Sequence, residues 1–144
     1  MKAGLLLAVL APLVPPTDPP VSFYTTYSYV RYTVYDFTEG QPPTHVAGVG
    51  GTLTLRADGS YDKRLSLLLG DSGPRYFTQH GRFSTRGDSI FFSFTDQAGP
   101  DVQRGTFRYA PGPGTLFIRL AGYPTGNHGD YELRALLPTG AAPR

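Results

Sequence analysis

Residues 51–67 read Gly-Thr-Leu-Thr-Leu-Arg-Ala-Asp-Gly-Ser-Tyr-Asp-Lys-Arg-Leu-Ser-Leu, and they alternate apolar and polar side chains on both sides of Asp58-Gly59. Alternation with a period of two residues is typical of half-buried β-strands. Asp-Gly between two such runs is typical of a tight hairpin turn, because glycine readily adopts positive φ. This stretch therefore predicts an antiparallel β-hairpin.

The same alternation returns as far as the C-terminal region. It occurs again at residues 90–94, 105–109, 116–120 and 131–135. We expect eight strands, at about 22–36, 50–56, 60–69, 75–85, 89–95, 102–109, 115–121 and 130–136. Short connections favour an up-and-down meander, and closure into a barrel removes the free sheet edges. The predicted fold is all-β, an eight-stranded antiparallel up-and-down barrel, with an open sandwich as the alternative.

The two ends of the chain are expected to lie outside the barrel. Met1-Lys2 and the apolar run Leu5–Val14 are typical of a signal peptide, and the run is too short to span a bilayer. We expect residues 1–20 to be a signal peptide and Pro-rich leader, 21–137 a single barrel domain and 138–144 a disordered tail. The protein is then secreted or periplasmic, with no transmembrane span.

Composition and charge exclude several classes of function. The chain has no cysteine, which excludes a disulfide scaffold and a thiolate metal site. The net charge is +2, and the 13 basic and 11 acidic residues are scattered, so no basic run is available to follow the phosphates of a nucleic acid.

Short motifs that carry chemistry in other proteins have simpler interpretations here. We interpret His128-Gly129-Asp130 and Arg86-Gly87-Asp88 as turns, the first rather than a metal site and the second rather than an adhesion motif. No serine lies in a Gly-x-Ser-x-Gly elbow. We therefore predict no catalytic residue, no metal ligand and no cofactor, and a non-enzymatic protein.

The segment Val21–Phe37 is rich in tyrosine and is apolar on both faces. One face carries Phe23, Tyr27, Tyr29, Tyr35 and Phe37, and the other carries Tyr24, Val30, Tyr32 and Val34. A strand with two apolar faces contains a β-bulge or has contacts on both sides.

Alternation also assigns the inner face of the barrel. The apolar residues expected to point inward are Leu53, Leu55, Tyr61, Leu65, Leu67, Leu69, Phe77, Phe83, Ile90, Phe92, Phe94, Phe107, Tyr109, Leu116, Ile118, Leu120, Tyr131 and Leu133. Two polar residues, Lys63 and Gln79, share the inward position. A polar group buried without a partner costs several kcal/mol, so a carboxylate or carbonyl of a ligand is a candidate partner. Alternatively, Lys63 reaches out of the barrel mouth along its aliphatic stem.

Two hairpins resemble those of small bacterial lipocalin-like domains, which are calycin-type barrels. The resemblance rests on residues 51–61, on 81–90 and on Tyr131-Glu132-Leu133, and it covers residues 51–136. The Gly-x-Trp motif of larger lipocalins is missing, because the chain has no tryptophan. The resemblance implies an eight-stranded barrel that holds an apolar ligand, and it implies no catalytic residue.

We therefore expect a non-enzymatic lipocalin-like protein that holds a small apolar or amphipathic molecule inside the barrel. The predicted ligand-binding residues are Lys63, Gln79, Tyr61, Phe77, Phe92, Phe107, Tyr109 and Ile118. One alternative is a filled barrel acting as a protein-interaction or structural module, through its Tyr-rich strand or the loop 122–129. Another is a small barrel isomerase or cyclase, which needs two polar groups converging in the cavity.

Overall fold

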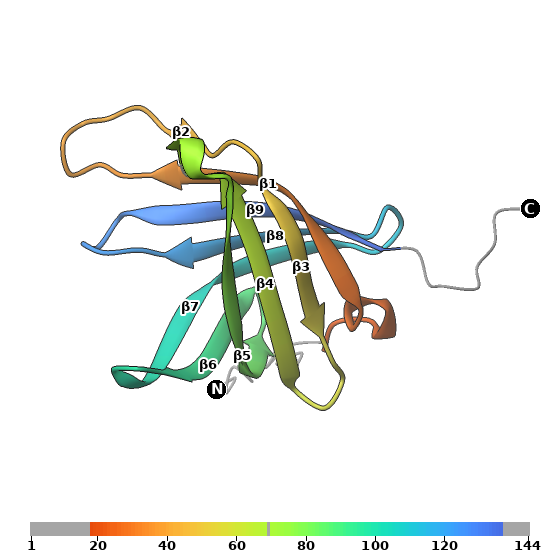
Figure 1. The fold of residues 1–144 in the computed structure, drawn as a ribbon. Coiled ribbons are helices and arrows are strands. Elements are labelled where there is room, and N and C mark those ends of the chain that lie inside the picture. The colour runs from red at the N-terminus through yellow and green to blue at the C-terminus, as the bar shows by residue number, and fades with distance from the viewer. Residues whose placement is uncertain (1–17, 69, 137–144) are drawn as a thin grey trace, which may run out of the picture.

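The computed structural model describes residues 18–68 and 70–136 and forms a closed antiparallel barrel of eight strands (Figure 1). In order around the ring these are β1 (Thr26–Tyr35), β3 (Gly50–Leu55), β4 (Ser60–Leu68), β5 (Pro74–Arg86), β6 (Ser89–Asp96), β7 (Gly99–Ala110), β8 (Thr115–Ala121) and β9 (His128–Ala135). Pairing of β9 with β1 closes the ring. The predicted fold class is confirmed.

Three short elements lie outside this ring. Strand β2 (Thr44–His45) pairs with β1, and the 3-10 turns are η1 (Val21–Phe23) and η2 (Gly70–Ser72). A strand beginning at residue 22 was the wrong expectation. Phe23 instead turns inward at the end of the barrel, where a continuing strand would carry it past the core.

Some expectations concern residues outside the described ranges. The proposed signal peptide falls almost entirely on residues 1–17, the tail falls on 138–144, and Leu69 is also undescribed. These boundaries stay predictions. Within the described ranges, no helix is long and apolar enough to cross a membrane.

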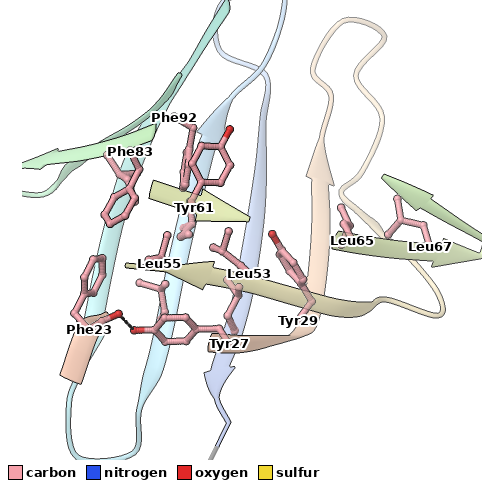
Figure 2. Close-up of a cluster of buried hydrophobic side chains, with 14 residues drawn as sticks. Phe23, Tyr27, Tyr29, Leu53, Leu55, Tyr61, Leu65, Leu67, Phe83 and Phe92 are labelled. Atoms are coloured by element: carbon pink, nitrogen blue, oxygen red, sulfur yellow. Dashed lines mark hydrogen bonds between the residues drawn. The ribbon is translucent and has the colours of Figure 1, made fainter. Parts of the chain in front are cut away.

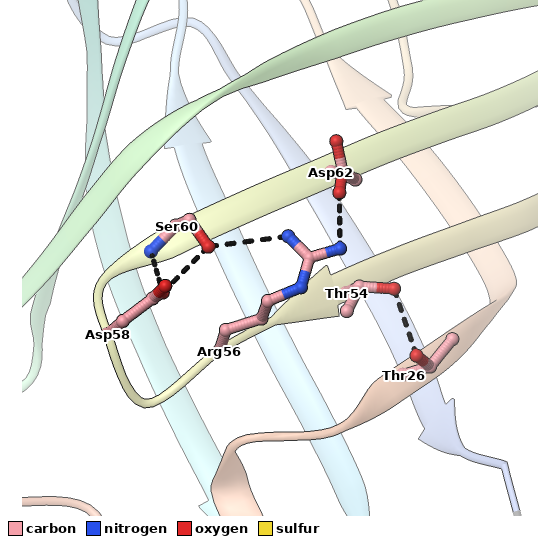
Figure 3. Close-up of polar contacts among 6 residues, drawn as sticks. All are labelled: Thr26, Thr54, Arg56, Asp58, Ser60 and Asp62. Atoms are coloured by element: carbon pink, nitrogen blue, oxygen red, sulfur yellow. Dashed lines mark hydrogen bonds and ion pairs between the residues drawn. The ribbon is translucent and has the colours of Figure 1, made fainter.

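The β3–β4 hairpin is stabilised by the turn chemistry expected from Asp58-Gly59 (Figure 3). The Asp58 carboxylate accepts hydrogen bonds from the Ser60 backbone N–H at 2.8 Å and from the Ser60 hydroxyl at 2.7 Å. These bonds lower the pKa of Asp58, because they favour its charged form. Gly59 has φ of 89°, a region that glycine enters without strain.

The other two predicted turns have different outcomes. Gly87-Asp88 connects the paired residues Arg86 and Ser89, and Gly87 has φ of 59°, so this turn is confirmed. His128-Gly129-Asp130 is not a turn, because these residues begin β9 and pair with β1 and β8.

The predicted bulge in the first strand is confirmed. The register between β1 and β9 shifts between Tyr29 and Arg31, which leaves Val30 as the extra residue. Beyond the shift, Tyr32 lies opposite Tyr131 and stacks on it, with ring centroids 4.3 Å apart. The bulge thus moves Tyr32 to the interior face and Tyr35 to the outer face, which reverses the assignment expected from simple alternation.

One end of the barrel is closed by an aromatic plug (Figure 2). Phe23 is fully buried, and its ring centroid lies 5.4 Å from that of Phe107 and 5.5 Å from that of Tyr109. The Tyr27 hydroxyl donates a 2.6 Å hydrogen bond to the Phe23 carbonyl oxygen. We call this end, formed by Phe23, Tyr27, Phe107 and Tyr109, the plugged end.

At the opposite end the barrel wall opens. Strand β5 pairs with β4 as far as Pro74, whereas its pairing with β6 ends at Gly81. The β4–β5 ribbon and the β6–β7 hairpin lead away from each other there (Figure 1). We call this end, where residues 74–80 pair on one side only among the described residues, the splayed end.

Most residues assigned to the inner face are in the core. The buried ones are Leu53, Leu55, Tyr61, Leu65, Leu67, Phe83, Ile90, Phe92, Leu116, Ile118 and Leu133, and the partly buried ones are Phe94, Phe107, Tyr109, Leu120 and Tyr131. Phe77 is the exception, because it is 46% exposed. Its position along β5 has the inward parity, but β6 has separated from β5 there and does not cover it.

Candidate functional site

The polar residues predicted to point inward do meet inside the barrel. Lys63 on β4 lies directly opposite Gln79 on β5 and Leu53 on β3. The Tyr61 hydroxyl donates a 2.7 Å hydrogen bond to Oε1 of Gln79. The Lys63 ammonium lies 5.6 Å from the centroid of the Tyr131 ring, within the distance of a cation–π contact.

Burial controls the ionisation of this cluster. Within the described ranges, no acidic side chain forms an ion pair with Lys63. Desolvation lowers the pKa of Lys63, because burial disfavours the charged ammonium. The same effect raises the pKa of Tyr61 to about 12 and also raises the pKa of Tyr29 and of Tyr131. The cluster therefore combines a weakened amine base with phenols that stay protonated.

Little space remains around this cluster. The residues that enclose it are Tyr29, Leu53, Lys63, Gln79, Phe92, Gln103, Ile118, Leu120 and Tyr131. The cavity between them has a volume of about 10 Å³. This is close to the minimum that holds a single water molecule. Side chains therefore fill the space around this cluster in this conformation.

The eight predicted ligand-binding residues divide into separate groups. Lys63, Gln79, Phe92 and Ile118 line the small cavity. Tyr61 joins them through its bond to Gln79.

The other three lie elsewhere. Phe107 and Tyr109 pack against Phe23 at the plugged end, and Phe77 lies half exposed at the splayed end.

Gln103 was missed by the sequence analysis. It lies opposite Phe92 and lines the cavity together with Lys63 and Gln79. A signal for it was present, because Gln103 shares the parity of Phe107 and Tyr109 along one strand. The alternation that singled out Lys63 and Gln79 applies equally to Gln103, which lies near the start of the strand expected over residues 102–109.

A second candidate site lies on the outer face of β1, β2, β7, β8 and β9. A groove of about 490 Å³ runs across these strands. Its polar lining includes three arginines, Arg31, Arg108 and Arg119, and three acids, Asp88, Asp130 and Glu132. The Arg108 guanidinium stacks over Phe117, 5.0 Å from the ring centroid. We call this site the outer groove.

The floor of the outer groove contains an ordered ion pair. Arg119 donates two hydrogen bonds of 2.8 Å to the two carboxylate oxygens of Asp130. These bonds raise the pKa of Arg119, since they favour the guanidinium. Beside the pair, His128 stacks on Tyr35 with centroids 4.5 Å apart, and its Nε2 lies 3.7 Å from Asp130 Oδ1.

The two sites differ in the functional groups that they present. Across the part of the chain that the structure describes, no group of three or more His, Cys, Asp or Glu residues is arranged to hold a metal ion. The interior offers an amine and two amides, and the outer groove offers guanidinium groups beside an aromatic ring.

The sequence matches no protein-family model, and it has no significant match among curated proteins. The closed eight-stranded antiparallel architecture is consistent with a calycin-like barrel.

Proposed function

We propose that this protein is a non-enzymatic, lipocalin-like binding module that engages a protein partner through its outer surface. The observation that carries the proposal is the contrast between the two sites. The interior cavity has a volume of about 10 Å³, whereas the outer groove has a volume of about 490 Å³. A partner thus finds room on the outside of the barrel without any rearrangement of the core.

The lining of the outer groove suits a protein surface that carries carboxylates. Arg31 and Arg108 form no ion pair within the described ranges, so their guanidinium groups remain available. Stacking on Phe117 holds Arg108 in place, which reduces the entropy lost on binding. Arginine and aromatic residues are also the types enriched at the centre of protein interfaces.

The location belongs to the same proposal. We propose a secreted or periplasmic location because Met1-Lys2 and the apolar run Leu5–Val14 are typical of a signal peptide. The module would then meet its partner outside the cytoplasm.

Native mass spectrometry of the full chain purified from its own host tests this function. We expect a co-purifying protein that is lost in Arg108→Glu and retained in Lys63→Met. Arg86→Glu is the matched control, because it makes the same change of charge outside the groove lining. Retention of the partner by Arg108→Glu, or no partner at all, would count against the proposal.

A second candidate function, a carrier for a small amphipathic molecule, is favoured by one observation. Lys63 is largely buried and has no carboxylate partner within the described ranges, so a ligand carboxylate or carbonyl would complete its interactions. Entry of a ligand requires side chains that line the cavity to move, because the cavity is small. A small-molecule adduct in the native mass, absent from Lys63→Met, is the result that would favour the carrier over the module.

A further inference from the structure

The splayed end leaves an open strand edge in the wall of the barrel. Residues 74–80 of β5 pair with β4 on one side, and the pairs with β6 begin only at Gly81. All of these residues except Gln79 are exposed. An exposed strand edge is a template for another extended chain.

The direction of the free backbone groups follows from one hydrogen bond. The Phe83 N–H donates to the Gly59 carbonyl oxygen, on the side of β4, at 2.7 Å. Backbone groups of successive strand residues point to opposite sides. Those of Phe77 and Gln79 therefore face β4, and those of Tyr76, Thr78 and His80 face the opening. The last three form a row spaced about 7 Å apart along the strand.

A groove runs beside this edge and is lined by basic residues. It has a volume of about 690 Å³ and lies between β5 and the β6–β7 hairpin. Arg82, Arg104 and His80 line it, with Asp101 as its only acid among the described residues.

The strand itself extends this basic character. Strand β5 contains three arginines and a histidine and no acidic residue. On β4, the Arg64 guanidinium lies over the exposed Tyr76 ring, 4.6 Å from its centroid. We call this surface, formed by Tyr76, Thr78, His80 and the flanking Arg64, Arg82 and Arg104, the open edge.

We propose that the open edge binds an extended acidic polypeptide as an added β-strand. The backbone of that peptide pairs with Tyr76, Thr78 and His80. Its side chains alternate between the two faces. Acidic residues on the outer face meet Arg64, Arg82 and Arg104, and apolar residues on the other face cover the exposed Phe77. Main-chain pairing supplies affinity and the alternating side chains supply specificity.

Charge decides which occupant the open edge accepts. A second copy of this chain would bring another β5, with its three arginines, one histidine and no acidic residue, toward the arginines of the open edge. Like charges placed side by side across a sheet are destabilising. An acidic segment would instead place opposite charges side by side, which is stabilising. The proposal depends on the interaction function proposed above, but it uses a different face of the barrel from the outer groove.

The test uses the full chain and a fluorescent peptide of alternating Glu and Val, with a Lys-Val peptide of equal length as the control. Thr78→Pro removes the N–H that faces the opening and leaves the β4 ladder intact, since proline is tolerated at a strand edge of this kind. Thr78→Ala is the matched control, because it shortens the same side chain and keeps the N–H. We expect fluorescence anisotropy to show Glu-Val binding that falls at least about tenfold in Thr78→Pro and less than about twofold in Thr78→Ala. We also expect binding to weaken with added salt.

Several results would overturn the proposal. They are absence of Glu-Val binding, equal binding of the Lys-Val peptide, and unchanged binding in Thr78→Pro. A dimer that forms without peptide and is lost in Thr78→Pro would assign the open edge to a second copy instead. If circular dichroism finds Thr78→Pro unfolded, the wild-type chain is titrated with two Glu-Val peptides, one N-methylated on the odd-numbered amides and the other on the even-numbered amides. Full affinity for both peptides would overturn the proposal. Arg108→Glu separates the two proposals, because it changes the outer groove and leaves the open edge intact.

Discussion

The two ends of the barrel are closed by different means. At the plugged end, Phe23 comes from outside the strand ladder and packs against Phe107 and Tyr109, so aromatic contacts seal the core. At the splayed end, β5 and β6 separate and Phe77 stays 46% exposed. Alternating strands therefore form the wall of the barrel but do not cover its ends. Here Phe23, which lies outside the strands, covers one end.

The same contrast separates stability from binding. Buried apolar contacts dominate at the plugged end, and they contribute most to the free energy of unfolding. Unpaired backbone groups and arginines dominate at the splayed end, where they are available to a partner. The cluster of Lys63, Gln79 and Gln103 lies between the two ends. Each of the following predictions tests one part of this division.

The largest effect is expected at the plug. Phe23→Ala removes a fully buried ring and leaves a cavity at the end of the barrel, so we expect the free energy of unfolding to fall by about 3–5 kcal/mol. Urea unfolding followed by circular dichroism measures this change. Val21→Ala, in the same turn but 87% exposed, should stay within about 0.5 kcal/mol of the wild type. A loss below about 1 kcal/mol in Phe23→Ala would show that the plug does not seal the core.

The interior tyrosines predict a loss of stability at high pH. Burial raises the pKa of Tyr61 to about 12 and raises those of Tyr27, Tyr29 and Tyr131 above the unfolded value of about 10. The folded chain therefore keeps protons that the unfolded chain releases. Stability from these groups is complete below about pH 10 and falls as pH rises through the folded pKa values, by about 1.4 kcal/mol per pH unit for each tyrosine.

Urea unfolding between about pH 8 and pH 11.5 checks this slope. Tyr61→Phe, which removes one of the four titrating groups, should make the slope shallower. A free energy of unfolding that stays constant across this range would contradict the burial of the phenols.

Alternation in the sequence predicted the ladder but not the ends. Leu53, Leu55 and Ile90 were placed correctly, because each lies between strands that continue on both sides. Phe77 alternates in the same way, yet it is exposed because the pairing of β5 with β6 ends at Gly81 and the two strands separate. Strand length and pairing depend on the three-dimensional register, which alternation does not contain. For the same reason, nothing local distinguished the plug residue Phe23 from a strand residue.

The candidate site was predictable in part. Lys63 and Gln79 were identified because polar residues at inward positions stand out against an apolar pattern. The size of the cavity depends on how side chains from β1, β7 and β9 pack around Lys63 and Gln79. This packing is a property of the whole barrel, and no single strand determines it. The outer groove combines residues from five strands, and no single segment of the sequence marks it.

A smaller effect on the free energy of unfolding, of opposite sign, is expected for Lys63, which lies in the interior between the plugged end and the splayed end. Lys63→Met replaces a buried amine without a carboxylate partner by an apolar chain of similar length, so we expect the protein to gain about 1–2 kcal/mol at pH 7. Burial lowers the pKa of Lys63, and the unfolded chain therefore binds more protons between the folded pKa and about pH 10.4. Stability from this group rises with pH in that window, and the rise should vanish in Lys63→Met.

Urea unfolding at several pH values measures both effects of the Lys63 substitution. Arg64→Met is the matched control, because its side chain lies on the outer face of the same strand and stacks on Tyr76. We expect it to change stability by less than about 0.5 kcal/mol. A loss of stability in Lys63→Met would mean that the contact of the amine with Tyr131 outweighs the cost of burying its charge.

The smallest effect is expected at the splayed end, and it is the direct counterpart of the plug. Phe77→Ala removes the same side chain as Phe23→Ala, but from a position that is 46% exposed, so we expect a loss of less than about 1 kcal/mol. Hydrogen exchange adds a second measurement at this position. The amides of Tyr76, Thr78 and His80, which face the opening, should exchange faster than those of Phe77 and Gln79, which face β4. A loss in Phe77→Ala as large as that in Phe23→Ala, or equal exchange along the strand, would mean that the splayed end is packed in solution. The open edge would then be covered, and the two ends of the barrel would no longer differ in kind.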